Sequence, residues 1–175
     1  GSPAEVLPGV VNSVLTQSDA VTGAKVLIEL GERFPNNADT QYGIGRFAMS
    51  RGERETALKA FDRALAIDPD NIDAILSSAR LNLEAGQGDE GLGPLQTYLK
   101  KNPDNVPGQL GFARLLVETG KYEEAAERFE EIASQFPEDA DAQYSIGLLA
   151  LEIKRVKQSE EYLLNVVNLN KHVDS

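Results

Sequence analysis

The chain has 175 residues, no cysteine and a formal net charge of -11 at pH 7, and its 41% hydrophobic content can bury a core of about one domain. An acidic surface repels phosphate backbones, so we expect no nucleic-acid partner. Without cysteine, neither a disulfide nor a thiolate zinc site can form. No apolar run approaches the roughly 20 residues that span a bilayer, so we expect no membrane insertion by this fragment. The opening Gly1-Ser2 is typical of a cloning scar.

Prolines recur at a fixed interval of 34 residues, within the phrases "RFPNNAD", "IDPDNID", "KNPDNVP" and "QFPEDAD". Such a period is the signature of a repeat architecture. The segments between the prolines superpose without a gap, and a less regular segment precedes them. The sequence therefore predicts a degenerate hairpin, four repeats and the start of a truncated further repeat, at residues 3–37, 38–71, 72–105, 106–139, 140–173 and 174–175.

Within the repeats, apolar residues recur at helical spacing. In "ETALKAFDRALAI" (55–67) and "EEAAERFEEIASQF" (123–136), the apolar side chains fall on one helical face. A glycine interrupts each of the first three repeats, at Gly52, Gly86 and Gly120, and a proline follows each second helix, which it cannot continue. Each unit is therefore predicted to be a helical hairpin, with about ten helices in all.

These units resemble the tetratricopeptide repeat. The Leu-Gly pair of that repeat corresponds to Ile44-Gly45 and Ile146-Gly147, and its later Ala-x3-Phe corresponds to Ala57/Phe61 and Ala125/Phe129. The slot for its tryptophan differs, because it holds Gln41, Ile75, Gln109 and Gln143. The resemblance implies an all-α fold, a right-handed α-solenoid of antiparallel helix-turn-helix hairpins.

The third hairpin along the chain, counting the degenerate one, contains a G-x-G-x-x-G at Gly86, Gly88 and Gly91. This fingerprint binds a dinucleotide only between a strand and a helix. A helical pattern precedes it here, and Gly86 fills the turn slot of its sister repeats, so we expect no dinucleotide. Gly91 and Gly93 each cost about 1 kcal/mol relative to alanine in a helix, and Pro94 costs about 3 kcal/mol if it falls in a helix interior. The segment 88–101 is therefore predicted to be the softest second helix.

Side chains for catalysis are scarce. His172 is the only histidine, so one copy cannot build a Ser-His-Asp triad or a multi-histidine metal site, and we interpret it as a solvated end residue. The segment "DPDNID" (68–73) resembles a calcium loop but lacks the glycine at its sixth position. It predicts a turn in which Asp and Asn cap the next helix. We expect no enzyme, no metal and no small-molecule cofactor.

The family geometry implies that the first helix of each repeat lines a concave groove. Arginine occupies the same position in three successive first helices, at Arg46, Arg80 and Arg114. On the same helical face lies a row of mainly apolar residues: Tyr42, Leu76, Leu110 and Tyr144. Either the arginines bond carbonyls or carboxylates of an extended partner, or they only pair with Glu84 and Glu118 on the surface. The predicted protein-binding residues are Tyr42, Arg46, Met49, Leu76, Ser77, Arg80, Leu110, Arg114, Glu118 and Tyr144.

A clamp for chaperone tails, a familiar use of such repeats, is absent. The slots in which that clamp holds its Lys, Asn and Arg side chains contain Tyr42, Arg46, Ser77, Pro107 and Gly111. The leading hypothesis is a non-catalytic scaffold that binds a partner protein or extended peptide along the concave groove.

The degenerate opening resembles that of multi-repeat outer-membrane lipoproteins of Gram-negative bacteria, which serve as adaptors for a periplasmic carboxy-terminal processing protease. That resemblance implies a fragment of a longer array, anchored in the outer membrane and located in the periplasm. The closing "NKHVDS" also leads us to expect a longer array, because it stops where another first helix should begin. The alternative is a regulatory or self-association domain of a larger enzyme or assembly factor, for example a glycosyltransferase or a cytochrome-maturation factor. The alternative location is the cytoplasm.

Overall fold

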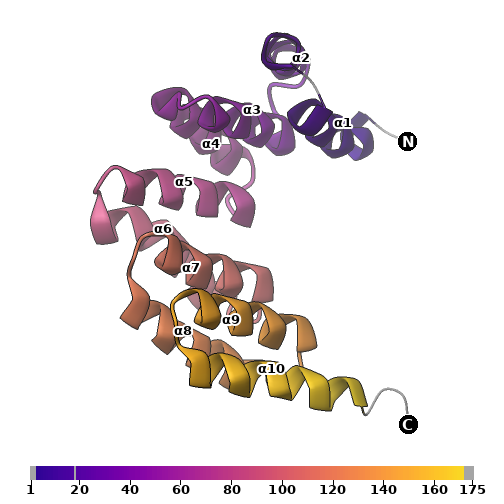
Figure 1. Cartoon of the computed structure of the whole chain (residues 1–175). Helices are drawn as coiled ribbons and strands as arrows, with labels where there is room; N and C mark the ends of the chain where they lie inside the picture. The colour runs from indigo at the N-terminus through magenta and orange to yellow at the C-terminus, as the bar shows by residue number, and fades with distance from the viewer. Residues whose placement is uncertain (1–2, 18, 172–175) are drawn as a thin grey trace. The chain divides into compact units, whose positions relative to one another are not determined.

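The computed structural model describes residues 3–17 and 19–171, which form ten α-helices and no strand (Figure 1). The all-α fold predicted from the sequence is confirmed. Two compact units make up the chain, Gly1–Tyr98 and Leu99–Ser175. The expected cloning scar, His172 and the start of a further repeat at 174–175 lie outside the described residues.

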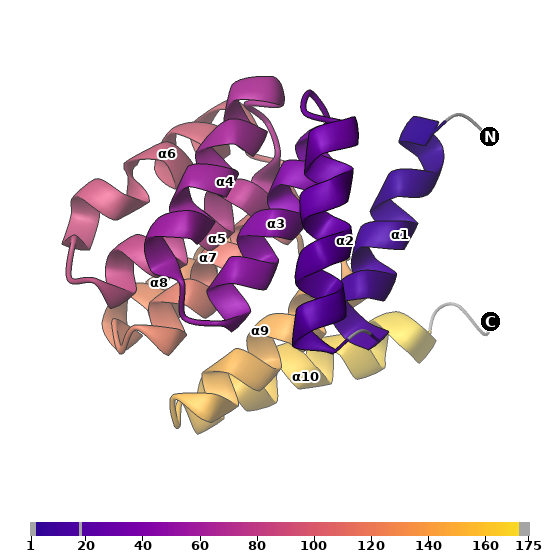
Figure 2. The ribbon, with the colours of Figure 1, turned by 90° about the horizontal axis from the view of Figure 1, so that it is seen from above.

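The first unit contains five complete helices and most of a sixth: α1 (Pro3–Gln17), α2 (Ala20–Arg33), α3 (Ala38–Ser50), α4 (Arg54–Ile67), α5 (Ile72–Glu84) and α6 (Gly88–Lys101). The second unit contains the end of α6 and four helices: α7 (Val106–Glu118), α8 (Tyr122–Gln135), α9 (Ala140–Glu152) and α10 (Val156–Lys171). In the first unit α3 packs against α1, α2 and α4, and in the second α9 packs against α7, α8 and α10 (Figure 2). No described helix has the length and apolar character needed to cross a membrane.

Each first helix of the four regular repeats begins with the same side-chain cap. The side-chain oxygens of Asn37, Asn71, Asn105 and Asp139 accept a hydrogen bond from the backbone N–H three residues later, at 2.8, 3.0, 2.7 and 2.8 Å. Such a cap satisfies one of the amides that a helix leaves without an internal partner. The predicted turn chemistry of "DPDNID" is confirmed at Asn71.

The turns inside the hairpins need a left-handed backbone. Gly52, Gly86 and Gly120 have φ values of +72°, +76° and +76°, a region that glycine enters without steric cost. In the last hairpin Lys154 takes this position with φ 64°. Because the helix α5 precedes Gly86, the G-x-G-x-x-G lies between two helices and lacks the strand that dinucleotide binding requires.

Glycine also brings the two helices of a hairpin together. A Cβ atom at Gly45 would lie 2.4 Å from the ring of Phe61, which is fully buried, and one at Gly147 would lie 2.7 Å from Leu163. These are the positions of the Gly in the Leu-Gly pair. The small residue there is thus required by the close approach of α3 to α4 and of α9 to α10.

The glutamines in the tryptophan slot join a first helix to the turn before it. Gln41, Gln109 and Gln143 are buried. Their amide nitrogens donate to the backbone carbonyls of Pro35, Pro103 and Phe136, at 3.5, 3.2 and 3.0 Å. A side-chain hydrogen bond therefore stands where the family pattern has an aromatic side chain.

Pro94 lies inside α6, which runs from Gly88 to Lys101. Proline has no backbone N–H, so the carbonyl four residues earlier loses its helical donor. Gly91 in the same helix is buried and cannot become alanine freely, because a Cβ there would lie 2.6 Å from the Cβ of Asn82. The low stability of α6 remains a prediction.

Candidate protein-binding site

The first unit brings together four of the predicted binding residues on α3 and α5. The Tyr42 hydroxyl is hydrogen-bonded to the side chain of Ser77, and the guanidinium carbon of Arg46 lies 5.9 Å from the centre of the Tyr42 ring. Arg80 is close enough for its charge to act on the same tyrosine. We call Tyr42, Arg46, Ser77 and Arg80 the Tyr42 cluster.

Burial and charge act together on this tyrosine. Burial raises the pKa of Tyr42 above its usual value, and the carboxylate of Asp73 raises it further. The hydrogen bond with Ser77 and the positive charges of Arg46 and Arg80 act in the opposite direction. Because the net shift is upward, the phenol is neutral at physiological pH, and the cluster offers guanidinium N–H groups and hydroxyl groups to carbonyl or carboxylate acceptors.

The cluster rests on the core of the unit. The Tyr42 ring centre lies 5.8 Å from that of Phe61. Met49, also predicted to bind, packs with Tyr42 against the buried side chains of Ala48, Ala57, Phe61 and Leu81. Leu76 is half-buried. Tyr42 and Met49 therefore support the helix packing as well as contributing to the face.

The second unit carries the other four predicted residues on α7 and α9. Leu110 is half-buried, whereas Arg114 and Glu118 are exposed. Tyr144 is 51% exposed. The three arginines are thus divided: Arg46 and Arg80 share the Tyr42 cluster, and Arg114 belongs to the second unit.

Two residues missing from the predicted set extend the α9 surface. Leu148 and Leu151 are 45% and 50% exposed, and they follow Tyr144 at the spacing that places all three side chains on one face of α9. Leu148 occupies the slot that arginine holds in the three preceding repeats. A prediction based on the arginine position leaves Leu148 out, although the 34-residue alignment of the repeats contains the signal. We call Tyr144, Leu148 and Leu151 the α9 stripe.

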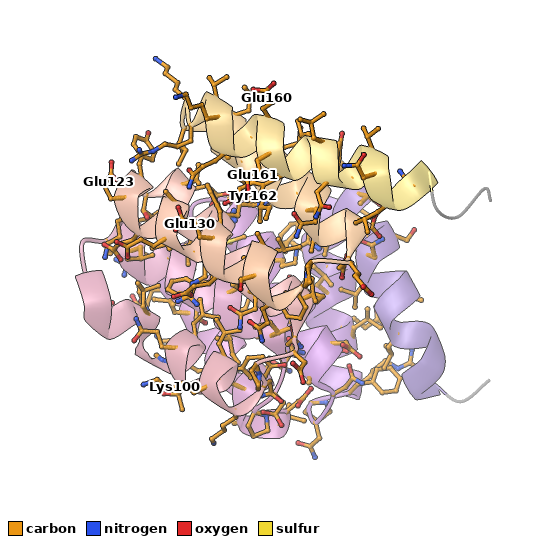
Figure 3. All side chains as sticks on the ribbon, turned by 90° about the horizontal axis from the view of Figure 1, so that it is seen from below. Lys100, Glu123, Glu130, Glu160, Glu161 and Tyr162 are labelled. Carbon is orange, nitrogen blue, oxygen red and sulfur yellow. The ribbon has the colours of Figure 1, made fainter. Side chains whose placement is uncertain are left out.

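Acidic residues and polar contacts join α8 to α10 and the residue before it. Arg155, the residue before α10, forms an ion pair with Glu123 of α8, and the amide of Gln158 in α10 donates to Glu130 at 2.7 Å. Figure 3 shows Glu130 beside Tyr162 of α10. Burial raises the pKa of Tyr162 to about 12, with help from the neighbouring carboxylates. Among the described residues, no group of His, Asp and Glu side chains is arranged to hold a metal ion.

Comparison with known proteins identifies the architecture. Residues 31–144 match the family model of the cytochrome c-type biogenesis protein H TPR domain. No curated protein gives a significant sequence match.

Solved structures of the same fold cover nearly the whole chain. MamA 41-end from Desulfovibrio magneticus RS-1 is 18% identical with a TM-score of 0.59, and the match covers 100% of this chain and 99% of that one. YrrB, a TPR protein with an unusual peptide-binding site, is 20% identical with a TM-score of 0.55, covering 95% and 86%. PilW, a type IV pilus biogenesis factor, is 11% identical with a TM-score of 0.66, covering 98% and 79%. At these identities the matches show the repeat-solenoid fold alone.

Proposed function

The chain belongs to the tetratricopeptide-repeat family, and on that premise we propose that it is a non-catalytic scaffold that binds a partner protein or an extended peptide through the first helices of its repeats. The Tyr42 cluster carries the proposal. It holds two guanidinium groups and a neutral phenol on adjacent first helices, in a half-buried setting. A charge-assisted hydrogen bond in such a setting contributes about 1.5 to 3 kcal/mol.

The two units favour different parts of a partner. The Tyr42 cluster suits backbone carbonyls or a carboxylate, because all its nitrogen groups are donors. The α9 stripe has no charge and suits apolar side chains, whose burial is favourable in proportion to the area removed from water. The expected partner segment therefore combines an acidic or carbonyl-rich stretch with aliphatic or aromatic side chains.

Two finer identities follow from different observations. The irregular first hairpin supports an adaptor for a periplasmic carboxy-terminal processing protease, with the full-length protein anchored to the outer membrane. The family model supports the alternative, an assembly factor in cytochrome c biogenesis, since it describes the TPR domain of such a protein. Fractionation of cells that express the full-length protein separates a periplasmic or outer-membrane location from a cytoplasmic one.

Site-specific photo-crosslinking tests the proposed face. A photoreactive residue replaces Ser50 on α3 or Leu151 on α9, both exposed, and the matched control replaces Glu127 on α8, which is also exposed. We expect crosslinks to one protein from positions 50 and 151 and none from position 127. Mass spectrometry of the product distinguishes a processing protease from a cytochrome-assembly protein. Crosslinks from position 127 alone would place the binding surface on the second helices and contradict the proposal.

A further inference from the structure

The first unit has a groove that the proposed function does not use. It lies between α2 and α4, over α3, and we call it the α2–α4 groove. Its volume is about 350 Å³, and its walls are mainly apolar, with Val21 and Ile28 of α2, Ile44 and Phe47 of α3 and Thr56 of α4. The groove lies outside the Tyr42 cluster, none of whose residues line it.

The two aliphatic side chains of α2 are unusually exposed. Val21 is 79% exposed and Ile28 is 59% exposed. Two of the four sister repeats carry acidic residues in both slots: Glu55 and Asp62 in α4, and Glu123 and Glu130 in α8. The other two carry Asp89 and Gln96 in α6, and Lys157 and Leu164 in α10. The first hairpin thus differs from all four in having aliphatic residues in both slots, which together form an exposed apolar patch.

The equivalent position in the second unit has polar bridges that the α2–α4 groove lacks. There, between α8 and α10, Glu123 pairs with Arg155 and Glu130 accepts from Gln158, so two polar bridges cross the groove. The corresponding pairs in the first unit are Val21 with Glu53 and Ile28 with Thr56. Neither pair can form such a bridge, because an aliphatic side chain has no polar atom. The α2–α4 groove is thus left open and apolar.

The lining of the α2–α4 groove has no net charge. Its only charged side chains, Arg51 and Glu53, form an ion pair at 2.7 Å. The chain as a whole has a net charge of -11. Two copies therefore repel each other in general, but the lining of this groove adds no net repulsion. A second copy therefore meets a surface that matches its own in both apolar character and charge.

We propose that the α2–α4 groove is a self-association surface, through which two copies pair in an antiparallel, two-fold contact. In this arrangement Val21 of each copy lies against Ile28 of the other, with Ala24 near the two-fold axis, so both exposed aliphatic side chains are covered at once. A contact of one helix and one groove is smaller than the roughly 1,200 Å² of a standard interface, so the dimer is weak and depends on concentration. The surface is independent of the proposed first-helix binding site.

Sedimentation velocity over a concentration series tests the pairing. The variant Val21→Glu/Ile28→Asp installs the residues that α4 carries in the same slots, so it is expected to keep the fold. The matched control is Leu164→Asp, which changes the same slot in α10, where Leu164 is 55% exposed. We expect the wild type and the control to dimerise with a Kd of about 10 to 100 μM, and the double variant to bind at least about tenfold more weakly.

Cysteine pairing gives a second readout, since the chain has no cysteine of its own. On oxidation, a mixture of Val21→Cys and Ile28→Cys chains should form mixed disulfides in preference to either homodisulfide. Three results would overturn the proposal. The wild type could stay monomeric to about 1 mM, the double variant could still dimerise, or Leu164→Asp could lose as much dimer affinity as the double variant. Crosslinking of a partner from positions 50 and 151 should proceed equally in the double variant, so failure of the dimer leaves the proposed function standing.

Discussion

Tyr42 and Tyr144 occupy the same slot of two repeats, yet their surroundings differ. Tyr42 is half-buried, hydrogen-bonded to Ser77 and packed near Phe61. Tyr144 is 51% exposed and continues into the apolar α9 stripe. The repeat position decides on which helical face a side chain lies, whereas the residues that surround it decide what it can bind. For Tyr42 those residues include Ser77 on α5.

We therefore expect the Tyr42 cluster and the α9 stripe to contribute differently to binding. The contacts within the Tyr42 cluster hold its side chains before binding, so these side chains lose little further entropy when a partner binds. The α9 stripe supplies apolar contact instead, and its contribution grows with the area that a partner covers. Selectivity is therefore expected to come from the first unit, and less selective affinity from the second.

The largest effect is expected when the support below the Tyr42 cluster is removed. Phe61 is fully buried, and Phe61→Ala should lower the free energy of unfolding by about 3 to 5 kcal/mol, because it leaves a cavity. Leu148→Ala, on the exposed stripe, should change it by less than about 0.5 kcal/mol. Chemical denaturation followed by circular dichroism measures both. A similar loss of unfolding free energy in the two variants would mean that the Tyr42 cluster and the α9 stripe are equally supported by the core, and would contradict the comparison of Tyr42 with Tyr144.

The helix that crosses the boundary of the two units is expected to respond in the opposite direction. Pro94 lies inside α6, so Pro94→Ala should restore a backbone hydrogen bond and stabilise that helix by up to about 3 kcal/mol. Hydrogen exchange of the wild type should show faster exchange in α6 than in α4 or α8, and the variant should reduce the difference, since Gly91 and Gly93 remain. Uniform protection of the three helices in the wild type would show that packing overrides the intrinsic cost of glycine and proline.

The hairpins could be predicted from the sequence because their signals are local. The 34-residue period, the turn glycines and the capping Asn and Asp residues each act within a few positions of where they stand. From the sequence alone, Gln109 is only a departure from the family pattern, because its bond to the Pro103 carbonyl depends on how α7 meets the preceding turn.

The candidate surfaces were harder to predict because their character depends on neighbouring helices. The Tyr42 cluster needs Ser77 from another repeat, and no spacing rule gives that hydrogen bond. The importance of Val21 and Ile28 appears only when the polar bridges of the equivalent groove are known. Alignment of the repeats indicates which residues share a helical face. It does not show which of those residues are covered by neighbouring helices.

Replacement of Arg80 tests the central claim most directly. If the Tyr42 cluster receives the partner, Arg80→Glu should weaken binding at least tenfold, about 1.4 kcal/mol, and leave the melting temperature nearly unchanged. The matched control is Glu127→Arg, an exposed charge reversal on α8. Titration calorimetry with the crosslinked partner measures all three proteins. Equal affinity for the wild type, Arg80→Glu and Glu127→Arg would contradict the account and remove the first-helix face of α3 and α5 from the binding mechanism.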